Sequence, residues 1–556
     1  MTRWTPRTVL AAPLIPCLLG PVLAFCGPAA AQSPKAPTTI VIVTGQQASL
    51  PIPTLMEGAQ ANVANYEIAD QLFLRLAGLG PTLTTAGDRG FVPLLAQRWV
   101  RRDSVTLAFE LDPRATWQDG APVTAQDVVF TFGRARDPSI APGLAGVLRR
   151  ITAVTAEGDR RVVFRFSQPY AEQVYDAVYH VAPLPAHLLA GLSPEELRRS
   201  PFLTSPVGSG PYRWVRRVGS EYIELGANER FFLGPPAIRR VIVRVATDPD
   251  ARINLILSGE ADAMDNIPPP LANLQRVGAD NDVRLIPVPS PLVAYLLFNQ
   301  RDPRDTSRPH PVLADPDVRR AIVLALDRPR LVRAVLGTYA EVPYGPVSSI
   351  LWIGHGTPRP LAQDVGRARD LLARRGWADR DGDGVVDRDG QPLSLTLSVP
   401  NTSGIRRQLA LLVQEQLRQV GVRIEVQQYD IGVWNQRRTE GRFDIDFSAA
   451  SQDPSPSGLT QSWSCGGASN VARYCDPTVD SLIDRAIRGG PHTAETWRAM
   501  LTRLEDDMPA AFMYAPLYVY AVHRRFTNVT IRPESSWLAL REWRVAPAQA
   551  RKGTGN

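Results

Sequence analysis

The side chains that could carry out catalysis are spread along the 556-residue chain without a catalytic spacing. Ser209 stands between Gly208 and Gly210, but the Gly-x-Ser-x-Gly spacing of a nucleophile elbow is absent. No HExxH pattern occurs, and the histidines show no metal-ligand spacing: His180, His187, His310, His355, His492 and His523. The sequence therefore favours a binding protein over an enzyme and predicts no bound cofactor.

The basic residues argue against several further classes of protein. The chain has a net charge of +7, yet its only lysines are Lys35 and Lys552, near its ends. A P-loop needs a lysine inside a glycine-rich loop, and a Schiff-base enzyme needs a buried one. The arginines alternate with acidic residues and form no long basic run, so nucleic acid is not an expected partner.

An acidic turn raises the possibility of a calcium site. Asp379, Asp381, Asp383 and Asp387 match positions 1, 3, 5 and 9 of an EF-hand loop. Position 12, which should be a bidentate glutamate, is Gly390. We therefore predict a structural turn without metal, with calcium as the alternative.

The first 31 residues are typical of a secretory signal peptide. Arg3 and Arg7 precede a short apolar stretch broken by prolines, and Ala29-Ala30-Ala31 suits cleavage before Gln32. A membrane anchor is the alternative, but the apolar stretch is short for a spanning helix. The expected location is the periplasm, where Cys465 and Cys475 would form a disulfide. A metal site is the alternative for this pair, but it lacks CxxC spacing and histidine partners.

Helical and strand patterns interleave along the rest of the chain, which indicates an α/β protein. Residues 38–44 form a β-branched run, and residues 104–111 and 161–166 alternate as half-buried strands do. Thr124 and Asp127 predict a helix N-terminus with a capping box. A long helical pattern covers residues 316–336, interrupted at Pro329.

Residues 93–132 resemble family 5 of the bacterial extracellular solute-binding proteins, which includes peptide-binding components of ABC importers. The resemblance rests on P-x-L-A-x-x-W, W-x-D-G-x-P and T-A-x-D-V patterns, here Pro93/Leu95/Ala96/Trp99, Trp117/Asp119/Gly120/Pro122 and Thr124/Ala125/Asp127/Val128. Further similar segments follow in the family's order at 207–214, 296–300, 315–332, 376–397 and 474–486. Together they extend over about residues 38–545.

This resemblance implies a two-lobed periplasmic-binding-protein fold with an additional subdomain inserted in lobe I. The expected division gives lobe I residues 38–80, 201–292 and 513–548, the inserted subdomain residues 81–200, and lobe II residues 293–512. A ligand would bind between the lobes, and closure would present a new surface to an ABC permease of the inner membrane. We expect a monomer.

The segment 443–456 contains the residues that indicate which class of ligand the protein binds. In peptide-binding members that this segment resembles, an aromatic residue is followed three positions later by an aspartate that takes the peptide's α-ammonium. Here Phe447 occupies the aromatic position, Ala450 the ammonium position, and Asp453 the later acidic position. Phe447 is expected to form a wall of the cleft, and Asp453 could replace the missing carboxylate.

Four further residues are weaker ligand candidates: Trp434, Trp463, Gln46 and Gln47, the glutamines because they follow the first strand. A peptide is the leading ligand by the resemblance. The alternatives are a receptor for an opine, glycan or other small organic molecule, a secreted hydrolase, and an envelope scaffold.

Overall fold

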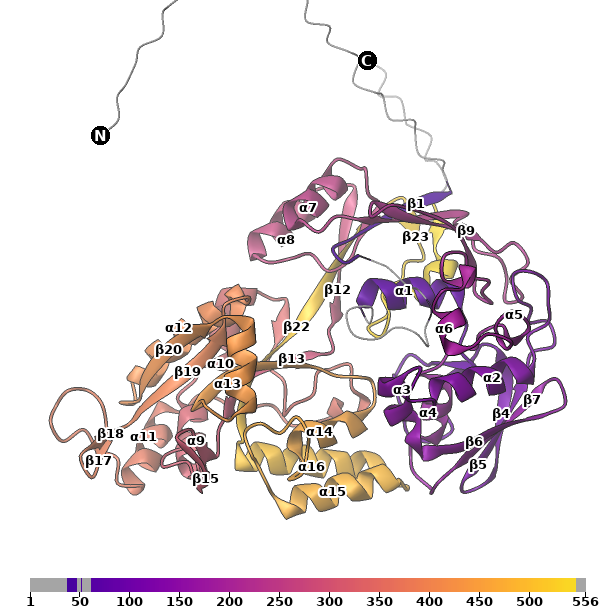
Figure 1. Ribbon diagram of the computed structural model, residues 1–556. Helices are drawn as coiled ribbons and strands as arrows, with labels where there is room; N and C mark the ends of the chain where they lie inside the picture. Colours follow the sequence, from indigo (N-terminus) through magenta and orange to yellow (C-terminus); the bar gives the residue numbers. More distant parts are fainter. Residues whose placement is uncertain (1–37, 48–51, 53–61, 547–556) are drawn as a thin grey trace, which may run out of the picture. The chain divides into compact units, whose positions relative to one another are not determined.

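The computed structural model describes residues 38–47, 52 and 62–546, so the predicted signal peptide lies outside the described residues. Its largest sheet follows the order β20-β19-β21-β13-β22-β11-β1-β10-β9-β8, with β12 and β16 paired to β22 (Figure 1). In chain order these strands are β1 (Thr39–Thr44), β8 (Tyr212–Val218), β9 (Tyr222–Ala227), β10 (Arg240–Val245), β11 (Ala263–Met264), β12 (Val283–Pro289), β13 (Leu292–Phe298), β16 (Ala340–Glu341), β19 (Ser394–Pro400), β20 (Arg423–Tyr429), β21 (Ile445–Ser451) and β22 (Ala510–His523).

Strand β22 belongs to both halves of this sheet. Residues 510–514 pair with β13, and residues 517–523 pair with β12. The strands β12 and β13 follow each other in the chain and are separated only by residues 290–291. The chain therefore passes from one half of the sheet to the other at two adjacent points.

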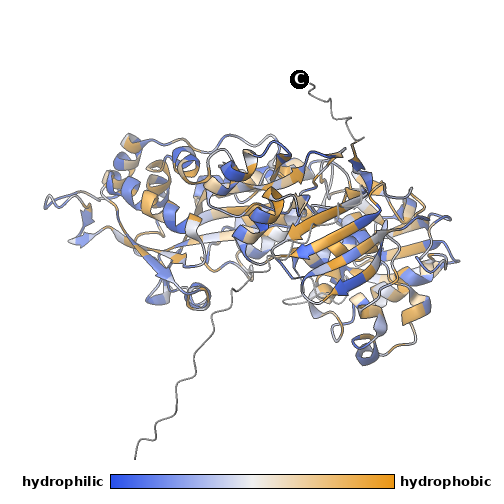
Figure 2. Ribbon diagram, turned by 90° about the horizontal axis from the view of Figure 1, so that it is seen from above, coloured by the Kyte–Doolittle hydropathy of each residue, from blue (hydrophilic) through white to orange (hydrophobic). Residues whose placement is uncertain are grey.

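Apolar side chains make the strands β1 and β13 suitable for burial on both faces. All six residues of β1 are buried, as its β-branched sequence predicts. Several strands are coloured as hydrophobic in Figure 2, whereas many helices show both hydrophobic and hydrophilic residues. The helices thus cover the sheet with one face and meet solvent with the other.

A second sheet has four antiparallel strands in the order β4-β5-β7-β6. Its strands are β4 (Ala96–Asp103), β5 (Thr106–Leu111), β6 (Ile151–Glu157) and β7 (Arg161–Phe166). Helix α2 (Ala125–Ala135) packs beside it and begins with the predicted capping box of Thr124 and Asp127. Asp127 also accepts hydrogen bonds from the indole of Trp117 and the amide of Ala186, at 3.2 and 2.7 Å. Three residues of the family-like patterns, Trp117, Thr124 and Asp127, therefore have a structural role.

The helical pattern at 316–336 forms two helices, α9 (Pro316–Leu324) and α10 (Arg328–Leu336). Asp327 caps α10 by accepting a hydrogen bond from the amide of Arg330, and Pro329 lies in the first turn, where its missing N–H costs nothing. The other helices of this region are α11 (Val365–Arg374), α12 (Gly404–Arg418), α13 (Ile431–Thr439), α14 (Thr460–Trp463), α15 (Pro477–Arg488) and α16 (Thr493–Asp507).

The Gly-Ser-Gly segment at 208–210 is a point of close backbone approach. A Cβ atom at Gly208 would lie 1.9 Å from the carbonyl oxygen of Leu72. Ser209 is 1% exposed, and its hydroxyl accepts a hydrogen bond from the amide of Leu74 at 3.1 Å. This serine is therefore a structural residue in the segment that packs against the end of α1 (Val63–Leu72).

The predicted domain boundaries are not tested by these observations and stay predictions. The boundaries at 292/293 and 512/513 fall at β13 and within β22, close to where the chain passes between the two halves of the large sheet. Among the described residues, no helix is both long and apolar enough to span a membrane.

Candidate functional site

A cavity of about 480 Å³ opens at the carboxyl end of β21. This size lies within the range of about 300–1,000 Å³ that is common for small-molecule sites. Its walls come from β13, α13, β21 and the segment that leads into α14, with Tyr295, Arg438, Ala450, Asp453, Leu459 and Trp463 among the lining residues. Two of the three residues predicted from segment 443–456 therefore line one cavity.

Phe447 does not form a wall of this cavity, contrary to the prediction. Its side chain is fully buried in the core on the opposite face of β21, 6.5 Å from the ring of Tyr514. Successive side chains of a strand point to opposite faces, so Phe447 and Ala450 lie on opposite sides of β21. The sequence pattern located the strand correctly but assigned Phe447 to the wrong face.

Arg438 supplies a positive charge to the cavity, and the sequence analysis did not identify it. Its Nε lies 3.3 Å from Oδ2 of Asp446, which is 1% exposed on β21. Burial raises the pKa of Asp446, while the charge of Arg438 opposes this rise. The Arg437-Arg438 pair in the last turn of α13 was the available signal, but sequence alone did not place it beside β21.

Trp434 contacts Arg438 from outside the cavity. It is 7% exposed, does not line the cavity, and its ring lies 5.4 Å from the guanidinium carbon of Arg438. A guanidinium over an indole face is a favourable cation–π arrangement. Trp434 therefore helps to hold Arg438 in place.

Asp453 supplies the opposite charge at an exposed position of the cavity wall. Burial and the negative charge of Asp453 both raise the pKa of Tyr66, which lies on α1. Asp453 also raises the pKa of Tyr175 and Tyr179, after burial as the main cause for both. Asp453 is thus near tyrosines of α1 and of the segment 173–179, which come from the other part of the chain.

Aromatic packing forms the floor of the cavity. Trp463 is 3% exposed, and its ring lies 5.6 Å from the rings of both Tyr295 and Phe512. Burial raises the pKa of Tyr295 to about 12, so its hydroxyl stays protonated at neutral pH. The cavity therefore combines an apolar floor with charged groups at its walls.

Gln46 and Gln47 do not line this cavity. The side-chain oxygen of Gln46 accepts a hydrogen bond from the amide of Val63, the first residue of α1, at 3.0 Å. The backbone carbonyl of Gln47 accepts one from the side chain of Asn62. Both glutamines, which follow β1, therefore form hydrogen bonds with residues at the start of α1.

Cys465 and Cys475 are joined by a disulfide in the connection between α14 and α15. Asn470, within the closed loop, donates from its side chain to the carbonyls of Ser464 and Tyr474. The loop that follows the cavity wall is therefore fixed both covalently and by hydrogen bonds.

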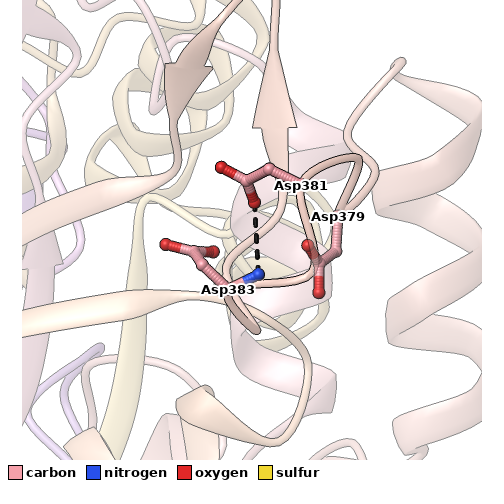
Figure 3. A group of neighbouring side chains, drawn as sticks. All are labelled: Asp379, Asp381 and Asp383. Atoms are coloured by element: carbon pink, nitrogen blue, oxygen red, sulfur yellow. Dashed lines mark hydrogen bonds between the residues drawn. The ribbon is translucent and has the colours of Figure 1, made fainter.

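The acidic turn brings three carboxylates together at the surface (Figure 3). Asp379 accepts hydrogen bonds from the amides of Gly382 and Gly384, and Asp381 accepts one from the amide of Asp383. Asp387, the remaining EF-hand position, pairs with Arg380 at 2.7 Å. These backbone contacts form a turn before the hairpin β17 (Asp387–Arg388) and β18 (Gln391–Pro392), and the choice between a structural turn and a calcium site stays a prediction.

The chain matches the family model for bacterial extracellular solute-binding proteins, family 5 middle region, over residues 90–470. The chain belongs to this family. The oligopeptide-binding protein AppA of Bacillus subtilis is 24% identical over 442 residues, which cover 77% of this chain and 79% of AppA.

Solved structures support the same fold for this family 5 protein. The structure of Bacillus subtilis AppA with a nonapeptide has a TM-score of 0.69 at 22% identity and covers 92% of this chain and 99% of AppA. The structure of NikA from Brucella suis with Fe(III)-EDTA has a TM-score of 0.76 at 18% identity, covering 91% and 99%. The family 5 protein thus has the two-lobed α/β fold, as predicted, while the inserted subdomain remains a prediction.

Proposed function

We propose that this protein is the periplasmic substrate-binding subunit of an ABC importer and that it captures peptides with free termini. It binds them reversibly without covalent chemistry and delivers them, as a monomer exported by residues 1–31, to an inner-membrane permease. The relatives named for peptide binding support the ligand class. Reversible capture needs no nucleophile, in agreement with the structural role of Ser209.

The observation that carries this proposal is the pair of opposite charges in one cavity, Arg438 and Asp453. A peptide with free termini carries an ammonium group and a carboxylate, and charge-assisted hydrogen bonds to such groups are strong in a partly dry site. Asp453 would bind the ammonium group, as the aspartate does that peptide-binding members carry at the position of Ala450. Arg438 would face a carboxylate, and Trp463 would contact apolar side chains.

Native mass spectrometry of the exported protein tests this proposal. The protein is incubated with an equimolar pool of di- to hexapeptides, each present in unblocked, N-acetylated and C-amidated form. Unblocked peptides should be retained at least tenfold more strongly than their N-acetylated forms, since acetylation removes the charge that Asp453 recognises.

The variant Asp453→Asn should remove this preference, whereas Asp389→Asn, in an exposed turn outside the cavity, should keep it. Equal retention of blocked and unblocked peptides would contradict the role of Asp453. Retention of a non-peptide solute from the expression host, with no peptide bound, would favour the alternative receptor for another small organic molecule.

A further inference from the structure

Glu172 is a buried carboxylate that the binding proposal does not use. It directly precedes α4 (Gln173–Val178), is 5% exposed, and does not line the cavity of about 480 Å³. Its carboxylate accepts hydrogen bonds from the hydroxyls of Thr85 at 2.5 Å, Ser455 at 2.7 Å, and Ser457. We call these four residues the Glu172 cluster.

The cluster joins two parts of the chain that are far apart in sequence. Glu172 and Ser455 are separated by 283 positions. The indole of Trp352 extends the contact by donating to the hydroxyl of Thr85 at 3.1 Å. Beside Glu172, the amide of Ala171 donates to the carbonyl of Ile487 at 3.0 Å. The segments around Thr85 and Glu172 are therefore fixed against the part of the chain that carries the cavity.

The serines of the cluster belong to the segment 452–459, which we call the ligand loop. Asp453, Ser455 and Leu459 of this loop line the cavity. Ser455 also accepts a hydrogen bond from the amide of Ser457 at 3.2 Å and so begins the short helix η6 (Pro456–Leu459). The hydroxyl that donates to Glu172 thus also determines the backbone path of the ligand loop.

Ionised carboxylates accept hydrogen bonds and donate none, so a glutamate suits three converging hydroxyl donors. Hydrogen bonds to a charged acceptor are short and about twice as strong as neutral ones. A glutamine of the same size would present an N–H₂ group to some of these hydroxyls and lose part of the arrangement. Burial raises the pKa of Glu172, and the hydrogen bonds from Ser457, Thr85 and Ser455 oppose this rise. The hydroxyls of the ligand loop therefore favour the ionised form of Glu172.

We infer that Glu172 is a positioning residue for solute binding: through Ser455 and Ser457 it holds the ligand loop, and with it Asp453, in the orientation that the cavity requires. Its importance for ligand affinity rests on the proposed function, but its control of the loop does not. Glu172 contacts no solute in this arrangement and acts only through the loop.

Hydrogen exchange followed by mass spectrometry tests this inference on the ligand-free protein. Glu172→Gln and Ser457→Ala should each increase exchange at least tenfold in peptides covering 450–463, and leave α12 unchanged. Ser457→Thr keeps a hydroxyl and should restore protection. Unchanged exchange in 450–463 for both Glu172→Gln and Ser457→Ala would overturn the inference.

Glu224→Gln is the matched control for removing a buried carboxylate. Glu224 is 8% exposed on β9 and pairs with Arg216 and Arg240, far along the sheet from the ligand loop. This variant should lower the unfolding temperature without increasing exchange in 450–463. An equal increase in both variants would reduce the role of Glu172 to general stability and overturn the inference.

A second readout separates this inference from the proposed function. With the unblocked peptide pool, Glu172→Gln should weaken retention at least tenfold, and its effect should not add to that of Ser457→Ala. If the wild-type protein retains no peptide while the exchange result holds, the proposed ligand fails but the loop-positioning role stands. If peptide binds equally well to the variant, Glu172 does not position the site.

Discussion

At the scale of single residues, burial decides what the ionisable groups of this protein can do. Asp446 lies under the cavity and is held by Arg438, whereas Asp453 lies at the exposed wall, free to meet a ligand. Asp446 lies at the start of β21 and Asp453 just beyond its end, and their different burial gives them different roles. Glu67 is a further case, in a part of the chain that the ligand proposal does not involve.

Glu67 predicts a specific pH dependence of stability. It is 5% exposed on α1, and burial, with smaller contributions from the charges of Asp265 and Asp70, raises its pKa from 4.5 to about 8. Between these two values the unfolded chain releases a proton that the folded protein keeps. The contribution of Glu67 to stability is therefore fully present below pH 4.5 and is lost as the pH rises towards 8, by about 1.4 kcal/mol per pH unit.

Glu67→Gln removes this titration. The unfolding temperature of the variant, relative to the wild type, should rise from pH 5 to pH 8 and stay constant above pH 8, as measured by circular dichroism. A difference that is independent of pH would show that Glu67 keeps an ordinary pKa in the folded protein.

At the scale of elements, the family-like patterns mark contacts that set helices and strands against each other. Asp127 joins the start of α2 to Trp117 and Ala186. Arg319, in another of these patterns, is 4% exposed and donates to the carbonyl oxygens of Asp507 and Met508, where α16 leads into β22. Such contacts fix the junctions between elements, and neither Asp127 nor Arg319 lines the cavity.

Gly208→Ala should destabilise the protein strongly. The added Cβ would lie 1.9 Å from the carbonyl oxygen of Leu72, which belongs to backbone and cannot move aside freely. We expect a loss of about 3 kcal/mol or more in the free energy of unfolding, measured by urea denaturation. Gly133→Ala, exposed in α2 with no atom near its Cβ position, should be neutral or stabilising by up to about 1 kcal/mol. Similar effects of both substitutions would contradict the close-approach argument.

The disulfide should stabilise the connection between α14 and α15 by restricting the unfolded chain. For a loop closed across 10 positions, we expect its loss to cost between about 2 and 3 kcal/mol. The double variant Cys465→Ser/Cys475→Ser should therefore unfold at a lower urea concentration. The reduced wild type should behave in the same way, and an unchanged midpoint for either protein would be evidence against this contribution.

At the scale of the whole molecule, the large sheet and the Glu172 cluster connect the same regions in different ways. Strand β22 is continuous through both halves of the sheet, whereas the cluster depends on side chains that can separate. On the proposed function, a peptide that binds this arrangement more tightly than one without the cluster contacts would stabilise both sets of contacts together.

Peptide binding should therefore protect two distant segments together. Addition of a retained unblocked peptide should slow hydrogen exchange in both 83–90 and 452–460, by similar factors, while β1 stays unaffected. Protection of 452–460 alone would show that binding is completed without the segment that carries Thr85, and would contradict coupling through the cluster.

The sequence alone determined the features that depend on near neighbours in the chain. The β-branched run of β1 and the capping box of α2 are local patterns, and each formed as predicted. A strand also formed at β5 (Thr106–Leu111), but the prediction that it is half-buried was wrong, because five of its six residues are buried. The family-like segments predicted the two-lobed α/β fold. They did so because the turns and packing contacts of that fold need particular residues at fixed spacing.

Which side chains meet depends on the packing of distant elements. Alternation in β21 fixes that Phe447 and Ala450 point in opposite directions, but the elements packed on each face determine which of them reaches the cavity. Arg438 approaches Asp446 from a different helix, and Glu172 reaches Ser455 across 283 positions. Contacts of this kind leave no spacing signal in a single chain, because chain folding rather than local geometry brings the partners together.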